Sequence, residues 1–237
     1  MAKQTRERFP VQAGIGEDPK GSPAEAPEGR PGGSQEGRLR EGPEVSPEEE
    51  LEDRIRRFVP WNEQEQADKA VILDKIAGEP DIFFRSNLAM HMSASAWVVN
   101  KSRDKVLMAY HNIYDSWSWL GGHADGDRNL LAVALREVRE ESGIENIRPV
   151  TEDIFSLEIL TVEGHEKRGA YVSSHLHLNV TYLLEADDRA AVRVKEDENS
   201  GVAWFGLREA VEASSEPWFQ RRVYGKLNEK LKNTIAK

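Results

Sequence analysis

Cysteine is absent from this chain of 237 residues, which excludes a disulfide framework and is compatible with a reducing compartment. No apolar run reaches the length of a membrane span, and the N-terminus lacks the apolar core of a secretory signal. The N-terminus is also too acidic for a mitochondrial presequence. These absences predict a soluble, cytoplasmic protein with no membrane partner.

Basic residues are outnumbered by acidic ones, 32 lysines and arginines against 42 aspartates and glutamates, so the formal net charge is −10. A general nucleic-acid binder would present a basic face, and that class of function is therefore not expected. A phosphate-bearing small molecule is still compatible with an acidic protein, because bound metal ions supply positive charge locally.

Proline and glycine are concentrated at the start of the chain. Seven of the 11 prolines and eight of the 18 glycines lie in residues 1–50, where aromatic residues are almost missing. Such a stretch buries too little apolar surface to offset its chain entropy. We therefore interpret residues 1–45 as a disordered tail, followed by a helical segment at 46–89 and the main domain with C-terminal helices at 90–237.

Capping signals and hydrophobic periodicity predict the elements of the folded part. Ser46 and Pro47 form a helix start, and this helix is expected to run toward Arg57. Further helices are predicted at 63–77, 207–213 and 218–231, and strands at 91–100, 105–111, 154–162 and 202–205. Residues 163–169 are expected to form a charged loop, and residues 170–184 a long strand or a bent pair.

One stretch, residues 121–144, combines a glycine turn, a polar loop and a helix. Asp127 or Asn129 is expected to cap the helix, because a short side-chain oxygen satisfies the free N–H groups of the first turn. Gly143 marks the end of the helix, since glycine enters the left-handed conformation without strain. Residues at three- and four-residue spacing predict its apolar stripe: Leu131, Ala134, Leu135 and Val138.

Glu137, Glu140 and Glu141 share another face of the predicted helix, where like charges repel by about 0.2–0.5 kcal/mol per exposed pair. A hard divalent cation relieves that repulsion, because Mg²⁺ prefers oxygen ligands. Arg136 stands next to them and can orient a carboxylate through a bidentate contact. For three glutamates alone, a solvated acidic face is the more common explanation.

The complete pattern resembles the Nudix box. That motif has a glycine, five residues, a glutamate, seven residues, Arg-Glu, an aliphatic residue, any residue, Glu-Glu, any residue, a glycine and an aliphatic residue. The matching positions are Gly122, Arg136, Glu137, Val138, Glu140, Glu141, Gly143 and Ile144. Arg128 stands in place of the first glutamate, which supports the metal network in the family.

The resemblance implies the Nudix fold, an α/β/α sandwich around a mixed sheet. It also implies a Mg²⁺- or Mn²⁺-dependent hydrolase that cleaves the phosphoanhydride of a nucleoside diphosphate linked to another group. The residues assigned to metal binding or catalysis are Glu137, Glu140, Glu141, Glu198 and Arg136. Glu198 enters by resemblance alone, and either Glu141 or Glu198 would be the general base. Gly122 would let the loop approach closely.

Substrate contacts are expected outside the motif. His175 and His177 face the same way on their predicted strand and would line a ligand groove, with Lys167 and Arg168 as phosphate contacts or as part of a solvated loop. Two histidines at this spacing can also bind zinc, but no third His, Cys or carboxylate at a familiar spacing supports that role. Trp119 is either a packing residue, the more common role, or a wall for a nucleotide base.

Two other functions were weighed against hydrolysis. Arg128 favours a Nudix-fold module that binds a nucleotide without turnover. An isoprenoid diphosphate isomerase on this fold would resemble its relatives in using an active-site cysteine, and this chain has none. Neither the substrate nor the oligomeric state follows from the sequence, although a homodimer is the commonest closed assembly.

Overall fold

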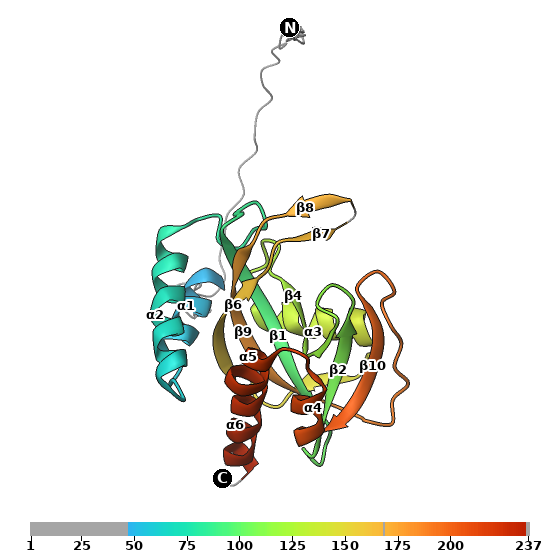
Figure 1. The fold of residues 1–237 in the computed structure, drawn as a ribbon. Helices are drawn as coiled ribbons and strands as arrows, with labels where there is room; N and C mark the ends of the chain where they lie inside the picture. Colours follow the sequence, from blue (N-terminus) through green and yellow to red (C-terminus); the bar gives the residue numbers. More distant parts are fainter. Residues whose placement is uncertain (1–46, 168, 236–237) are drawn as a thin grey trace, which may run out of the picture. The chain divides into compact units, whose positions relative to one another are not determined.

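The computed structural model describes residues 47–167 and 169–235. The predicted tail at 1–45, the predicted cap Ser46 and the candidate phosphate contact Arg168 lie outside these residues. The folded part begins with two helices, α1 (Pro47–Arg57) and α2 (Glu63–Gly78), close to their predicted ranges (Figure 1). Asn62 starts α2, because its side chain accepts a hydrogen bond from the Glu65 N–H at 3.0 Å.

A long parallel pair forms the centre of a mixed, eight-stranded sheet. In this pair, β1 (Met90–Val99) runs beside β9 (His175–Ala186), with His91 opposite His177 and Ala96 opposite Tyr182. The antiparallel strands around the pair are β2 (Lys105–His111), β3 (Ser116–Ser118), β4 (Leu120–His123), β5 (Ile147–Pro149), β6 (Ser156–Val162) and β10 (Asn199–Gly206). A separate hairpin consists of β7 (His165–Lys167) and β8 (Ala170–Val172).

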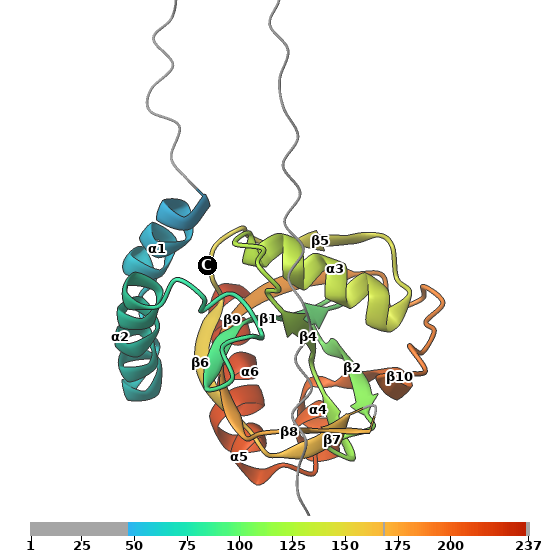
Figure 2. The ribbon, with the colours of Figure 1, turned by 90° about the horizontal axis from the view of Figure 1, so that it is seen from above.

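Helices cover both faces of the sheet (Figure 2). One face packs on α3 (Leu130–Ser142), through a core that includes Met92 and Ala94 of β1. The other face packs on the C-terminal helices, through a core that includes Trp97 and Leu231. These helices are α4 (Leu207–Ala213), α5 (Pro217–Phe219), a π-helical turn at Gln220–Tyr224 and α6 (Gly225–Ile235). The predicted α/β/α sandwich with a mixed sheet is therefore confirmed.

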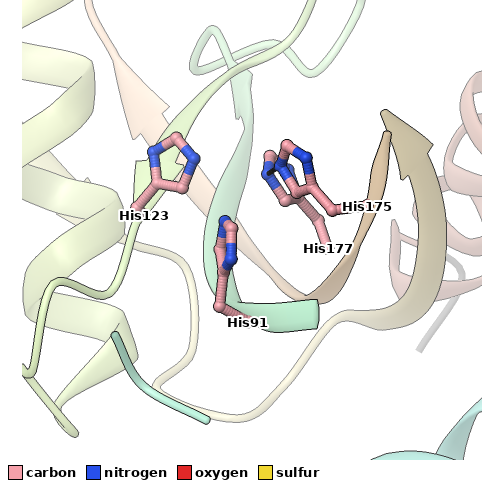
Figure 3. A group of neighbouring side chains, drawn as sticks. All are labelled: His91, His123, His175 and His177. Carbon is pink, nitrogen blue, oxygen red and sulfur yellow. Dashed lines mark hydrogen bonds between the residues drawn. The ribbon is translucent and has the colours of Figure 1, made fainter. Parts of the chain in front are cut away.

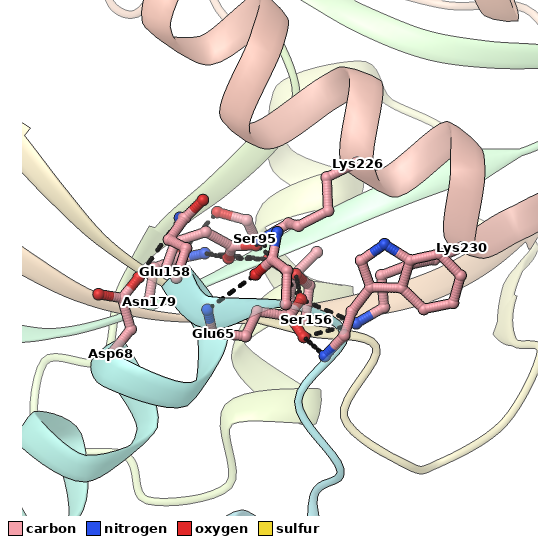
Figure 4. A network of polar contacts seen from close by, with 12 residues as sticks. Glu65, Asp68, Ser95, Ser156, Glu158, Asn179, Lys226 and Lys230 are labelled. Atoms are coloured by element: carbon pink, nitrogen blue, oxygen red, sulfur yellow. Dashed lines mark hydrogen bonds and ion pairs between the residues drawn. The ribbon is translucent and has the colours of Figure 1, made fainter.

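The first two helices belong to the same core as the sheet. Ile72 and Ile76 of α2 are buried in the core that also holds α3, and α2 lies beside β6. A buried polar network joins Glu65 of α2 to α6, with Lys230 Nζ at 2.8 Å from Glu65 Oε1 (Figure 4). None of the described helices is long and apolar enough to cross a membrane.

Several predicted boundaries differ from the structure. The charged stretch predicted as a loop at 163–169 contains β7. The stretch predicted at 170–184 as a long strand or a bent pair is divided between β8 and β9. Gly169 has a φ of 77°, a conformation that suits glycine and lets the hairpin reverse. The last strand begins at Asn199, before its predicted start at 202.

Candidate active site

The helix α3 begins and ends at the positions that its capping residues dictate. Asn129 is the cap, because its Oδ1 accepts a hydrogen bond from the Ala132 N–H at 3.1 Å. Asp127, the other predicted cap, instead accepts a hydrogen bond from the Asn129 N–H at 2.9 Å. Gly143 ends the helix in the left-handed conformation with a φ of 72°. The glycine turn, polar loop and helix are thus placed as expected.

The buried face of α3 differs from the predicted stripe. Its buried residues are Leu130, Val133, Ala134, Val138, Glu141 and Ser142, whereas the predicted Leu131 and Leu135 are only partly buried. The helix is therefore rotated relative to the prediction, because the contiguous apolar run 130–135 does not define one face. As a result, Glu141 lies on the buried side of α3, apart from the exposed Glu140.

Two carboxyl groups of α3 meet bare backbone on β4. The Gly121 N–H donates a hydrogen bond to Glu141 Oε2 at 3.2 Å, and Glu141 is 6% exposed. A Cβ atom on Gly122 would lie 2.6 Å from Glu137 Oε2, so any larger residue would displace this carboxyl. Gly122 therefore makes room for the Glu137 carboxyl, and the Gly121 N–H holds the Glu141 carboxyl, between helix and sheet.

The electrostatics of these acids suit a cation. Burial raises the pKa of Glu141 well above its usual range, and repulsion by Glu137 raises it further. Burial also raises the pKa of Glu137, followed by repulsion from Glu140. A hard divalent ion would relieve both effects, since it prefers carboxylate oxygens. The donor set therefore fits Mg²⁺ or Mn²⁺.

The loop before β10 brings a further acid to this helix. Lys195 Nζ lies 3.1 Å from Glu140 Oε2 and 2.9 Å from Glu198 Oε2, and so joins the two carboxylates. The buried amide of Asn199 donates to the Glu141 carbonyl oxygen at 3.1 Å, which holds the loop on α3. Glu198 is thus near the box glutamates, and Lys195 is a residue that sequence reasoning missed. Its only sequence signal was a lysine preceding an acidic run.

Arg128 and Arg136 have different surroundings. Arg136 Nη1 lies 3.3 Å from Asp127 Oδ2, and its Nε lies 3.9 Å from Glu137 Oε1. It therefore bridges the loop to one glutamate, without the expected bidentate contact. The Arg128 guanidinium carbon lies 4.3 Å above the centre of the buried Phe83 ring, in a cation–π contact.

The segment before β1 holds the box loop in place, a contact that the sequence did not predict. The Gly126 N–H donates to the Phe83 carbonyl oxygen at 2.9 Å. Arg85 pairs with Asp125 through two hydrogen bonds, one of them from Nε to Oδ1 at 2.6 Å. The helical segment that resembles no part of the motif thus supports the motif's loop.

The residues predicted to contact substrate do not all lie in the same part of the structure. Trp119 is 9% exposed and makes edge-to-face contacts with Tyr224 and Phe219, so it packs in the core with the C-terminal helices. This is the packing role, and a wall for a nucleotide base is not supported. His175 and His177 do face the same way, and their Nε2 atoms are 3.1 Å apart. Lys167 lies on β7, and its charge is one of the lesser causes that lower the pKa of His123.

The chain is similar to known proteins over much of its length. A family model described as NUDIX domain matches residues 89–227. The asymmetrical bis(5′-nucleosyl)-tetraphosphatase of Mus musculus is 29% identical over 131 residues, which are 54% of this chain and 78% of that protein. The Rattus norvegicus protein of the same name is 30% identical over 95 residues, 40% of this chain and 58% of that protein. A crystal structure of a C. elegans Ap4A hydrolase in a binary complex has 20% identity and a TM-score of 0.45, and covers 61% of this chain and 97% of its own.

Proposed function

We propose, from the premise that this chain belongs to the NUDIX family, that it is a divalent-metal-dependent hydrolase of a nucleotide phosphoanhydride. The observation that carries the proposal is a pair of carboxyls on α3, the buried Glu141 and the partly buried Glu137, packed against the backbone of Gly121 and Gly122. The similar proteins of mouse and rat are named as bis(5′-nucleosyl)-tetraphosphatases, so a dinucleoside tetraphosphate is the first substrate to test.

The acidic residues would hold the metal ion and accept a proton in the proposed reaction. Glu137, Glu140 and Glu141 would hold Mg²⁺ or Mn²⁺, with Glu198 as a further ligand. When bound, the ion screens the phosphate charges and lowers the pKa of a coordinated water. The Gly121 N–H keeps Glu141 in one orientation. Either Glu141 or Glu198 takes the proton from the attacking water.

The chain's cations would order these acids. Arg136 lies close enough to Glu137 to hold its carboxyl in register with the loop at Asp127. Lys195 keeps Glu198 close to Glu140 through its two ion pairs.

The test is phosphate or pyrophosphate release from a panel of nucleotides with Mg²⁺ or Mn²⁺. The panel contains a dinucleoside tetraphosphate, nucleoside triphosphates, an oxidised nucleotide and nucleotide sugars. Glu141→Gln should lower turnover by about 10²–10⁴-fold and keep the fold, because the amide still accepts from Gly121. The matched control is Glu212→Gln, whose carboxylate is exposed and pairs with Arg208 at 2.9 Å. Near-normal turnover in a well-folded Glu141→Gln variant would contradict the proposal.

A second candidate is a module that binds a nucleotide without turnover. Arg128 favours it, because a cation stacked on Phe83 stands where the motif has a glutamate. Arg128→Glu separates the two functions in the same assay. Turnover by the natural chain would exclude the binding module. No turnover by the natural chain, together with turnover by Arg128→Glu, would support it.

A further inference from the structure

Four of the chain's six histidines meet on one face of the sheet (Figure 3). His91 comes from β1, His123 from β4, and both His175 and His177 from β9. The strand register makes them neighbours, since His91 pairs with His177 and His123 pairs with Ser93. One ring nitrogen from each histidine lies within 4.8 Å of those of the other three. The sequence offered only the pair on β9, and the fold supplies the third and fourth members.

Hydrogen bonds orient two of the four rings. His91 Nδ1 lies 3.1 Å from the Asn87 carbonyl oxygen, and His175 Nδ1 lies 2.8 Å from the Ser173 carbonyl oxygen. A carbonyl accepts only from a protonated nitrogen, so these contacts place the proton on Nδ1 and leave Nε2 unprotonated. The unprotonated Nε2 of His91 has no hydrogen-bond partner among the described residues, whereas that of His175 is hydrogen-bonded to Nε2 of His177. Metal-binding histidines characteristically donate their other ring N–H to a carbonyl or carboxylate in this way.

Two observations on the Nε2 atoms that face the cluster are compatible with metal binding. His91 is 4% exposed, and its buried Nε2 has no hydrogen-bond partner among the described residues. The Nε2 atoms of His175 and His177 are 3.1 Å apart. Two nitrogen ligands of a tetrahedral zinc ion are about 3.3 Å apart, given bonds of about 2.0–2.1 Å. The β9 pair is thus close to the spacing that a single ion requires.

The charge state of the cluster also suits a metal. Burial lowers the pKa of His123 to about 3 and that of His177 to about 2, with further lowering by Arg85 and by the neighbouring imidazoles. The His123 and His177 rings are therefore neutral near pH 7, which is the form that binds metal. Asp125, which pairs with Arg85, is the nearby acid that opposes this lowering at His91 and His123.

We propose that His91, His123, His175 and His177 bind a divalent transition-metal ion, with zinc as the ion that their ligand type and number fit. This site is chemically separate from the glutamates of α3, because it offers imidazole nitrogen where they offer carboxylate oxygen. A bound ion would tie β1 and β9 to β4 at the residue next to Gly122. The proposal does not depend on the hydrolase activity.

Zinc titration of the full chain tests the proposal directly. After removal of metal with a chelator, Zn²⁺ is added in competition with a chromophoric chelator, and the affinity and stoichiometry are measured. We expect the natural chain to bind one equivalent of Zn²⁺. The double variant His175→Ala/His177→Ala should bind Zn²⁺ at least about 100-fold more weakly. Matched controls are His165→Ala and His111→Ala, which remove histidines outside the cluster and should leave the affinity unchanged. The double variant Glu137→Gln/Glu141→Gln should also retain the zinc.

A second measurement on the natural chain avoids any folding defect of the variants. In NMR spectra of the imidazole nitrogens, Zn²⁺ should shift the resonances of the four clustered histidines and leave those of His111 and His165 in place. The proposal is overturned if Zn²⁺ shifts no resonance of the cluster. It is equally overturned if the histidine double variant folds and binds zinc as the natural chain does, or if the zinc is lost from the glutamate variant instead.

Discussion

Gly122 and Glu137 occupy adjoining space, since a Cβ atom at residue 122 would lie 2.6 Å from Glu137 Oε2. Contacts below about 3 Å are not tolerated by real Cβ atoms, so the carboxyl and a side chain at residue 122 exclude each other. The position of one candidate metal ligand is therefore set by the absence of a side chain on the facing strand.

Replacement of this glycine should move the acid. Gly122→Ala forces the Glu137 carboxyl out of its place, and we expect weaker Mn²⁺ binding and at least about tenfold lower turnover. The loss of stability should be small, because the displaced atoms are the end of a flexible and partly exposed side chain. Metal titration and urea unfolding measure the two effects. Gly78→Ala is the matched control, because a Cβ there has no neighbour within 4 Å. Unchanged metal affinity in Gly122→Ala would show that Glu137 is not a ligand.

Lys195 should compete with a metal for the carboxylates that it joins. Its ammonium group lies 3.1 Å from Glu140 and 2.9 Å from Glu198, and these acids raise its pKa despite partial burial. Lys195→Met removes a positive charge, so we expect Mn²⁺ to bind about two- to fivefold more tightly, equivalent to roughly 0.5–1 kcal/mol.

The matched control for that prediction is Lys105→Met, which removes an ammonium group paired with Asp188 at 2.8 Å away from the box glutamates. Its Mn²⁺ affinity should equal that of the natural chain. Weaker Mn²⁺ binding in Lys195→Met would instead mean that the lysine's main effect is to hold Glu198 in position.

Capping residues close to the helix ends in sequence were enough to predict several helix boundaries. Asn129 and Gly143 bound α3, and Pro47 stands at the first position of α1, because caps act through the chain's own neighbouring N–H and C=O groups. The rotation of α3 was missed because the run 130–135 is apolar on every side of a helix. Glu141 of α3 is hydrogen-bonded to Gly121 of β4, and the periodicity of the helix sequence cannot predict a contact with a strand.

The histidine cluster shows the limit of sequence spacing. His175 and His177 are neighbours on one strand, and the alternation of β9 predicts that they face the same way. Their partners His91 and His123 come from other strands, and only the parallel pairing of β1 with β9 and the β1–β4 register bring them close. Pairings between distant strands are set by the whole sheet, so a local pattern could not reveal the cluster.

The buried ion network between α2, β6 and α6 should contribute strongly to stability. Lys226 Nζ lies 2.8 Å from Glu158 Oε1 and 3.3 Å from Glu65 Oε1, and both acids are fully buried (Figure 4). Lys226→Met leaves two buried carboxylates with one lysine, so we expect a loss of about 3–5 kcal/mol in the free energy of unfolding. Urea unfolding measures it.

Two further variants separate charge from packing in that network. The double variant Lys226→Met/Glu158→Gln removes one charge of each sign and should recover part of the loss. Arg208→Met breaks an exposed pair with Glu212 and should cost at most about 1 kcal/mol. A loss in Lys226→Met as small as that of Arg208→Met would show that the buried pairs are not important to stability.

The same network should make stability depend on pH through Glu65. Burial has the largest effect and would raise the pKa of Glu65, but the charges of Lys226 and Lys230 and hydrogen bonds from Lys230 and Ser156 hold it below its ordinary value of 4.5. A carboxyl whose pKa is lower in the folded chain contributes stability above the unfolded pKa and loses it as the pH falls through the folded pKa. The natural chain should therefore be more stable than Glu65→Gln at pH 7, with a difference that shrinks as the pH falls below the ordinary glutamate pKa of 4.5, since a protonated glutamate resembles glutamine. Urea unfolding of both proteins across this range gives the difference, and a constant difference would mean that the lysines do not lower the pKa of Glu65.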